Sequence, residues 1–190
     1  MDPFGRKKTV LIIDDDKNRR KKIYDVLKLT GFDLFSANTG AEAMPRLPSQ
    51  KPRMVIVSTV SKAFSGIEFV KELRTYGLGQ KMTVVGIVSA ADGERKPCIA
   101  AGANDILQEG FEPYRLVEMV SKYMNIDKLE IPEEQFAKRR EVVEELADSY
   151  RERVRESAKG EPSPAVQLLL PDGRDLGMFQ LTEDAGKHRA

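Results

Sequence analysis

Side chains that could do chemistry follow short apolar runs at two points of the sequence. Asp14 and Asp15 come directly after an apolar run at 9–13, and Ser58 follows another at 54–57. If these runs are parallel strands, all three side chains lie at one edge of the sheet, where α/β proteins place their ligands. Paired carboxylates are typical ligands of Mg²⁺ or Ca²⁺, and a serine at the end of a strand is a candidate nucleophile.

A catalytic role for Ser58 needs a base that the sequence does not offer. The only histidine, His188, lies among the last residues of the chain, and Cys98 is the only cysteine. A serine hydroxyl is a poor nucleophile without an activating base, and one cysteine with one histidine supplies neither an internal disulfide nor a usual zinc site. We therefore expect Ser58 to cap a strand or to hydrogen-bond within a pocket.

The elements that must position these side chains alternate along the first two thirds of the chain. Short apolar runs predict buried strands at 9–13, 33–36, 54–57, 84–88 and 105–107. Segments of helical periodicity separate them, the first one after the expected cap Asp16. This alternation predicts right-handed βαβ units and an α/β fold with a five-stranded, doubly wound parallel sheet. Pro45 and Pro97 fall within two helical segments, which should be short or irregular.

Composition narrows the classes of partner. The chain has 190 residues, of which 41% are hydrophobic, and 31 basic residues nearly balance 30 acidic ones. Such a balance gives no general attraction to nucleic acid or anionic lipid. The cluster at 17–22 is basic, but it lacks aromatic partners and should be solvated. No apolar stretch approaches the roughly 20 residues that span a bilayer. We expect a cytoplasmic protein without nucleic-acid binding or membrane insertion.

The sequence changes character at about residue 131 and predicts a charged, amphipathic helix at 131–160. Its apolar positions recur at helical spacing and form one stripe: Phe136, Val143, Leu146, Tyr150 and Val154. The stripe needs a partner, which is the preceding domain, a second copy or another protein. Residues 161–190 predict a linker, a β-hairpin around the turn at 171–173, and a tail.

Four landmarks in register resemble the receiver domain of bacterial response regulators. They are VLIIDDD, PRMVIVSTVSKAFSGIEF, VVGIVSAAD and AGANDILQEGF. The resemblance covers residues 8–126, after an N-terminal tail at 1–7, and it implies the flavodoxin-like receiver fold. It also implies a phosphorylation pocket in which Asp14 and Asp15 are the acidic pair and Ser89 is the switch hydroxyl.

The remaining pocket positions depart from the family. The phospho-accepting aspartate falls on Ser58, the lysine on Glu109, and an aromatic of the fifth strand on Ile106. A unit charge at about 4 Å contributes roughly 4 kcal/mol at an effective dielectric near 20, and Glu109 reverses its sign. We expect a degenerate pseudo-receiver, not an enzyme, whose pocket has negative walls. No cofactor is expected beyond weak Mg²⁺ or Ca²⁺ at Asp14 and Asp15.

The resemblance also implies an interaction face. Its predicted residues are Arg95, Leu107, Tyr114, Arg115, Glu118 and Lys122. The leading interpretation is a non-enzymatic adaptor that binds protein partners of a bacterial two-component pathway, with homodimerisation as a further option. The alternative is a regulated switch that works through phosphorylation of Ser58, or through a small molecule or cation in the acidic pocket.

Overall fold

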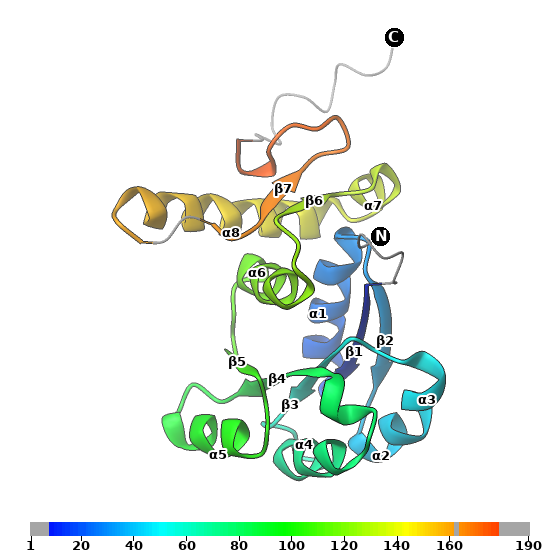
Figure 1. Ribbon diagram of the computed structural model, residues 1–190. Helices are drawn as coiled ribbons and strands as arrows, with labels where there is room; N and C mark the ends of the chain where they lie inside the picture. The colour runs from blue at the N-terminus through cyan, green and yellow to red at the C-terminus, as the bar shows by residue number, and fades with distance from the viewer. Residues whose placement is uncertain (1–7, 162–163, 179–190) are drawn as a thin grey trace. The chain divides into compact units, whose positions relative to one another are not determined.

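Five parallel strands form the sheet of the first part of the chain, in the order β2-β1-β3-β4-β5 (Figure 1). They are β1 (Thr9–Ile13), β2 (Asp33–Ala37), β3 (Met54–Ser58), β4 (Thr83–Val88) and β5 (Asp105–Gln108). The five predicted strands are thereby confirmed. The order reverses beside β1, so the carboxyl ends of β1 and β3 form the switch point at which doubly wound sheets bind ligands.

The computed structural model describes residues 8–161 and 164–178. The predicted tails, with His188, lie outside the described residues. The chain divides into two compact units, one made of residues up to 28 with 32–111 and the other of 29–31 with the residues from 112 onward. Among the described residues, no helix is long and apolar enough to cross a membrane.

Short helices connect the strands of the first unit. They are α1 (Lys17–Leu29), α2 (Gly40–Ala43), α3 (Leu47–Gln50), α4 (Gly66–Thr75) and α5 (Arg95–Ala100). A 3₁₀ turn at Met44–Arg46, which contains Pro45, separates α2 from α3, and α5, which contains Pro97, has only six residues. Both segments are short or irregular, as the two prolines predict.

The sheet of the first unit is apolar on both faces, as expected of parallel strands covered by helices. In β1, Val10 to Ile13 are all 0% exposed. One face contributes Leu11, Val55 and Val84 to a core shared with Phe69 of α4 and Cys98 of α5. This packing fixes the strand ends that carry the candidate site.

The second unit contains helices and a short strand pair. Its elements are α6 (Pro113–Met124), β6 (Lys128–Glu130), α7 (Glu133–Lys138), α8 (Arg140–Ala158), β7 (Gln167–Leu169) and a 3₁₀ turn at Leu176–Met178. The predicted helix at 131–160 is interrupted: Arg139 has φ −127° and ψ 47°, so α7 ends there and α8 begins. The long helix is therefore α8, with 19 residues.

The apolar stripe of α8 packs against α6 within this unit. The rings of Tyr114 and Tyr150 stack with their centroids 4.6 Å apart, and the Tyr114 amide donates to Ser149 Oγ at 2.9 Å. Val143 and Leu146 are also buried. The prediction for the end of the stripe is wrong, because Val154 is 42% exposed and Arg153 is 7% exposed. Phe136, on α7, is half-buried.

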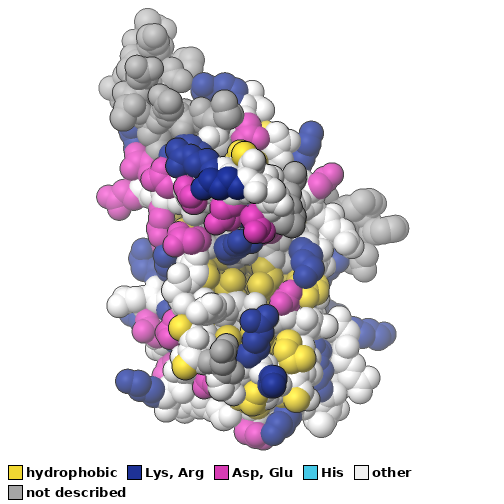
Figure 2. Space-filling view, turned by 90° about the vertical axis from the view of Figure 1, so that its left-hand side faces the viewer, with side chains coloured by type: hydrophobic (Ala, Val, Ile, Leu, Met, Phe, Trp, Pro, Cys, Tyr) yellow, Lys and Arg dark blue, Asp and Glu magenta, His cyan; other side chains and the backbone are white. Residues whose placement is uncertain are grey.

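The exposed side of α8 is solvated. Acidic and basic side chains intermingle there, in the upper part of Figure 2. Arg140 pairs with Glu144 at 3.3 Å and Arg155 with Glu152 at 3.2 Å. Such exposed pairs contribute little to stability, so the burial of its apolar stripe is what holds α8.

Up to residue 178, where the description of the structure ends, the predicted hairpin consists of a turn with one antiparallel bridge. Leu170 N donates to Arg174 O at 2.7 Å across the turn, and Leu169 bridges Asp175. The apolar run after the turn begins as the 3₁₀ turn at Leu176–Met178. The strand β7 pairs mainly with β6, in parallel, which the sequence analysis did not predict.

Candidate functional site

Three sequence signals position the candidate site at the carboxyl ends of β1 and β3. Asp14, directly after β1, and Ser58, the last residue of β3, are both 0% exposed. Gly66 opens α4 so close to β3 that a Cβ there would collide with the carbonyl oxygen of Ser58. Asp16 caps α1 by accepting from the amides of Asn18 at 2.8 Å and Arg19 at 2.9 Å. The cap fixes the first turn of α1 beside the pocket.

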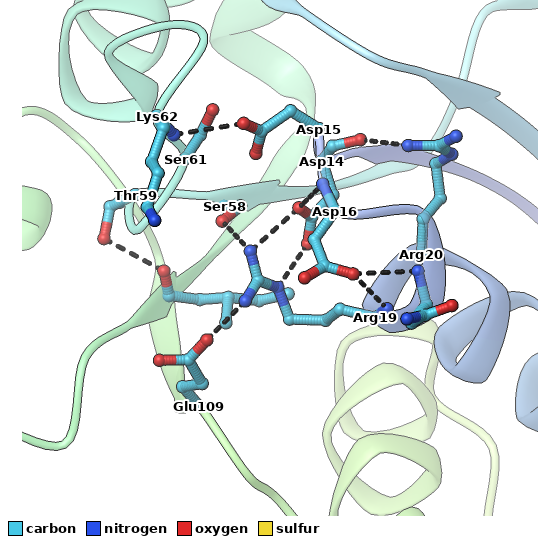
Figure 3. A network of polar contacts seen from close by, with 12 residues as sticks. Asp14, Asp15, Asp16, Arg19, Arg20, Ser58, Thr59, Ser61, Lys62 and Glu109 are labelled. Carbon is cyan, nitrogen blue, oxygen red and sulfur yellow. Dashed lines mark hydrogen bonds and ion pairs between the residues drawn. The ribbon is translucent and has the colours of Figure 1, made fainter.

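The guanidinium of Arg19, from that first turn, fills the pocket (Figure 3). Its Nε lies 2.5 Å from Asp14 Oδ2 and its Nη2 lies 2.9 Å from Asp14 Oδ1. Nη2 also donates to Ser58 Oγ at 3.1 Å, and Nη1 forms an ion pair with the carboxylate of Glu109. A single planar fork thus joins three side chains, in the bidentate geometry that arginine favours with carboxylates.

The electrostatics of the pocket follow from this fork. The hydrogen bond with Asp14 raises the pKa of Arg19, and burial opposes it with a smaller effect. Arg19 therefore carries its charge permanently in a site that is closed by Asp14 and Glu109. The pocket has carboxylate walls, Asp14 and Glu109, as expected, but the sequence analysis did not predict that the guanidinium of Arg19 lies between them.

Asp15 points away from Asp14 and holds a loop. Its Oδ2 accepts from the amides of Lys62 and Ala63, each at 3.1 Å. Burial alone would raise the pKa of Asp15, but hydrogen bonds from the Ser61 hydroxyl and these two amides outweigh it and lower that pKa. The two aspartates predicted to share a cation therefore have different partners.

The carboxylates do not assemble into a metal centre. Within 8–161 and 164–178, no three Asp, Glu, His or Cys side chains are placed so that they could hold a metal ion. Magnesium requires near-octahedral oxygen ligands. In this arrangement the guanidinium of Arg19 already binds Asp14 and Glu109, so the residues present do not fit Mg²⁺ unless Arg19 moves.

Ser89 stands apart from this network. Its hydroxyl accepts from the Ala91 amide at 3.3 Å. The Ser89 amide donates to Glu94 Oε2 at 3.3 Å, and the same carboxylate oxygen lies 2.8 Å from the hydroxyl of Thr59. Of the five predicted pocket residues, the structure thus gathers Asp14, Ser58 and Glu109 around Arg19 and leaves Asp15 and Ser89 outside.

The predicted interaction face is partly buried. In the first unit Arg95 is exposed but Leu107 is only 5% exposed. In the second unit Tyr114 is 1% exposed beneath α8, and Arg115 forms an ion pair with Glu118 at 3.1 Å. Lys122 is exposed, with Nζ 4.9 Å from the ring centroid of Tyr123. The prediction is therefore wrong for Leu107 and Tyr114, which are not surface residues.

Sequence reasoning missed the most important residue, Arg19, because it lay within a basic cluster that was expected to be solvated. The neighbouring Arg20 donates to the backbone carbonyl of Asp14, and Lys21 pairs with Asp25 at 2.6 Å. The available signal was a charge argument: a pocket that keeps its carboxylates and loses its lysine needs another cation nearby. This argument indicates the basic cluster at 17–22 but does not select Arg19 among its members.

Comparison with known proteins places the chain in a family. The response regulator receiver domain matches residues 10–121, so the chain belongs to the receiver-domain family of two-component signalling. The chemotaxis protein CheY of Thermotoga maritima is 30% identical over 119 residues, which cover 60% of this chain and 96% of that protein. A response regulator structure from Chloroflexus aurantiacus is 26% identical, covers 63% of this chain and 99% of that one, and superposes with a TM-score of 0.60.

Two longer relatives extend beyond the receiver. The response regulator MprA of Mycobacterium tuberculosis is 26% identical over 127 residues, which cover 66% of this chain and 53% of that protein, so the chain spans about half of its length. PhoP of Bacillus subtilis, an alkaline phosphatase synthesis transcriptional regulatory protein, is 25% identical over 187 residues, which cover 93% of this chain and 76% of that protein.

Proposed function

We propose that this receiver domain is a pseudo-receiver that acts as a non-enzymatic, cytoplasmic signalling adaptor and binds protein partners without being phosphorylated. The observation that carries the proposal is the position of Arg19, whose guanidinium binds Asp14, Ser58 and Glu109 at once. The family's chemistry needs a free carboxylate nucleophile and a metal ion in this space.

Each requirement of phosphoryl transfer meets an obstacle here. Ser58 offers a hydroxyl that accepts a hydrogen bond from Arg19, and a permanently charged guanidinium cannot act as the base that would activate this hydroxyl. A metal ion would have to displace Arg19 from Asp14, which is 0% exposed. Breaking one partner out of such a buried pair typically costs about 3–5 kcal/mol. The protein therefore keeps its internal cation.

The alternative, a switch through phosphorylation of Ser58, is disfavoured by its burial. Ser58 is 0% exposed, and it lies opposite Ile87 in the pairing of β3 with β4. A protein kinase acts on a hydroxyl that it can reach in an extended segment, so it would have to open the end of β3. A small molecule in the pocket would have to displace Arg19 in the same way as a metal ion.

Phosphoryl uptake tests the proposal directly. The full chain is incubated with acetyl phosphate and Mg²⁺, and its intact mass is measured. We expect no gain of a phosphoryl group by the natural sequence or by Ser58→Asp, because Arg19 and Glu109 remain. The triple variant Ser58→Asp, Glu109→Lys, Arg19→Ala should gain one. Stoichiometric labelling of the natural sequence would refute the proposal, and labelling of Ser58→Asp alone would show that Arg19 does not block the pocket.

The proposed adaptor does not bind nucleic acid, although one relative is a transcriptional regulatory protein. What supports this part of the proposal is that Arg19 and Arg20 bind Asp14 and Lys21 pairs with Asp25, so the basic cluster at 17–22 is partly neutralised within the protein. Anisotropy of a labelled random-sequence duplex at low salt should show no saturable binding. Saturable binding with a steep salt dependence would contradict this part of the proposal.

A further inference from the structure

Thr59, the residue after Ser58, forms an unusual contact on the other side of β3. Its amide donates to Ile87 O at 2.8 Å, which extends the pairing of β3 with β4. Its hydroxyl oxygen lies 2.9 Å from the same carbonyl and 2.8 Å from Glu94 Oε2. Thr59 is 8% exposed. A hydroxyl has one proton, so it donates to one of these two acceptors at a time or is shared between them, and the charged carboxylate of Glu94 is the stronger acceptor.

Glu94 reaches Thr59 from the N-terminal boundary of α5. It occupies the N-cap position of that helix, yet its side chain makes no capping hydrogen bond. Instead its carboxylate accepts from the Ser89 amide at 3.3 Å and contacts Thr59. The Glu94 carboxylate therefore joins the end of the segment 89–94 to its first residue, Ser89, and to Thr59, which follows β3.

The helix that follows is packed too tightly to move alone. Cys98 of α5 is 0% exposed, and a Cβ at Gly86 of β4 would collide with its sulfur. A Cβ at that glycine would also lie 3.8 Å from the methyl carbon of Thr59. Any opening of the segment 89–94 that shifts the start of α5 must therefore disturb the contact around Cys98.

We propose that Glu94 and Thr59 form a latch that fixes the segment 89–94 and the start of α5 against the end of β3. This latch goes beyond the Arg19 network, with which it shares no hydrogen bond. Its biological meaning rests on the proposed function: a domain that receives no phosphoryl group needs another device to set the conformation of this segment. The hydroxyl of Ser89 plays no part in it, since that hydroxyl bonds Ala91.

The rate at which iodoacetamide alkylates Cys98 reports how often the latch opens. The label reports on this site alone, because Cys98 is the only cysteine of the chain. Burial, and to a smaller degree the charge of Glu94, raises the pKa of this thiol to about 11, so the closed form reacts slowly. Thr59→Val removes the hydroxyl and keeps both the shape and the charge of Glu94. We expect labelling about tenfold faster, the scale of losing one hydrogen bond to a charged group.

The matched control is Thr75→Val, which removes an exposed hydroxyl that donates to Glu72 O at 2.7 Å at the end of α4. The control should label at the natural rate. Rates are measured at several low urea concentrations, because opening of the latch alone should depend little on urea, whereas global unfolding depends on it strongly. An unchanged rate in Thr59→Val, or an equal acceleration in Thr75→Val, would overturn the proposal.

Should Thr59→Val lose cooperative unfolding, Glu94→Gln supplies the second variant. Glutamine accepts a weaker hydrogen bond than a carboxylate, so we expect labelling faster than in the natural sequence, by a smaller factor than in Thr59→Val. The loss of the charge also lowers the pKa of Cys98. The pH dependence of the labelling rate separates that effect from opening. Neither experiment uses phosphoryl transfer, so the latch can fail while the proposed function holds, and the reverse.

Discussion

The two units bury one arginine each among carboxylates, and the two sites are built very differently. In the first unit Arg19 makes direct hydrogen bonds of 2.5 and 2.9 Å to Asp14. In the second unit Arg153 lies between Glu118 and Glu156, with its ion-pair distances at 3.7 and 3.8 Å. The Nε of Arg153 has no hydrogen-bond partner within the described part of the chain.

The difference shows that burying a charge does not by itself stabilise a fold. Desolvation of a buried ion costs several kcal/mol and is offset only by good geometry with hydrogen bonds. Arg19 meets this condition with a bidentate fork, whereas Arg153 does not. We infer that the first site depends on its arginine and that the second depends on aromatic and aliphatic packing around Tyr114 and Tyr150.

The largest effect is expected for Arg19→Ala, which tests whether the first site depends on its arginine. It leaves Asp14, which is 0% exposed, without its cation, so we expect the free energy of unfolding to fall by about 3 kcal/mol. Urea denaturation of the full chain measures the loss. Lys21→Ala, in the same helix turn, is the control and should change stability by less than about 0.5 kcal/mol.

In the double variant Asp14→Asn, Arg19→Ala we expect part of the stability to return, since the unpaired carboxylate is removed. Equal stability of Arg19→Ala and the natural sequence would mean that the fork is incidental to the fold.

Stability at alkaline pH tests the burial of Tyr150 in the second unit. Burial, followed by the charge of Asp175, raises the pKa of Tyr150 from its ordinary 10 to about 12. The folded state therefore holds this proton more tightly than the unfolded state, and the resulting stability is present below pH 10. We expect a loss of order 2 kcal/mol between pH 10 and 12, at 1.36 kcal/mol per pH unit.

Tyr150→Phe should reduce this pH dependence, as measured by urea titrations at several alkaline pH values. Burial also raises the pKa of Tyr114, so part of the dependence should remain in this variant. A pH dependence as steep in Tyr150→Phe as in the natural sequence would show that Tyr150 does not contribute to it.

A smaller effect should follow from added Mg²⁺. The natural sequence should show no shift of melting temperature at millimolar Mg²⁺, because Arg19 holds Asp14 and Glu109. In Arg19→Ala we expect a rise of a few degrees, as binding to the folded state alone predicts. A comparable rise in the natural sequence would mean that a divalent cation displaces the guanidinium.

The smallest effect is expected for Arg153→Met. Methionine keeps the length of the buried stem and removes a charge whose ion pairs are long. We expect the free energy of unfolding to change by less than about 1 kcal/mol, in either direction. A loss of about 3 kcal/mol in urea denaturation, as large as that expected for Arg19→Ala, would show that the second unit depends on its arginine as much as the first.

The sheet was predictable because β1, β3 and β4 are apolar runs that are buried on both faces, whereas β2 and β5 carry weaker signals and are only partly buried. The switch point followed from the alternation of strands and helices. The C-terminal pairing of β6 with β7 was not predictable, since Lys128–Glu130 and Gln167–Leu169 are short runs with no periodic signal. Likewise, nothing in the composition at Arg139 marks the break between α7 and α8.

The candidate site was predictable in its position and not in its contents. Asp14 and Ser58 were placed correctly because they end neighbouring strands. Arg19 was not, because a long flexible side chain can either enter solvent or fold back, and local sequence does not decide between them. The same holds for Glu94, whose side chain contacts Thr59.

The parallel pairing of β6 and β7 sets the limits within which this protein can be shortened. Removing β7 alone would leave β6 with an open edge, and a lone strand has no stability of its own in water. Ending the chain after α8 would therefore remove β7, the pairing partner of β6. A designed fragment should keep or discard residues 112–178 as a whole, because α8 also covers Tyr114 of α6.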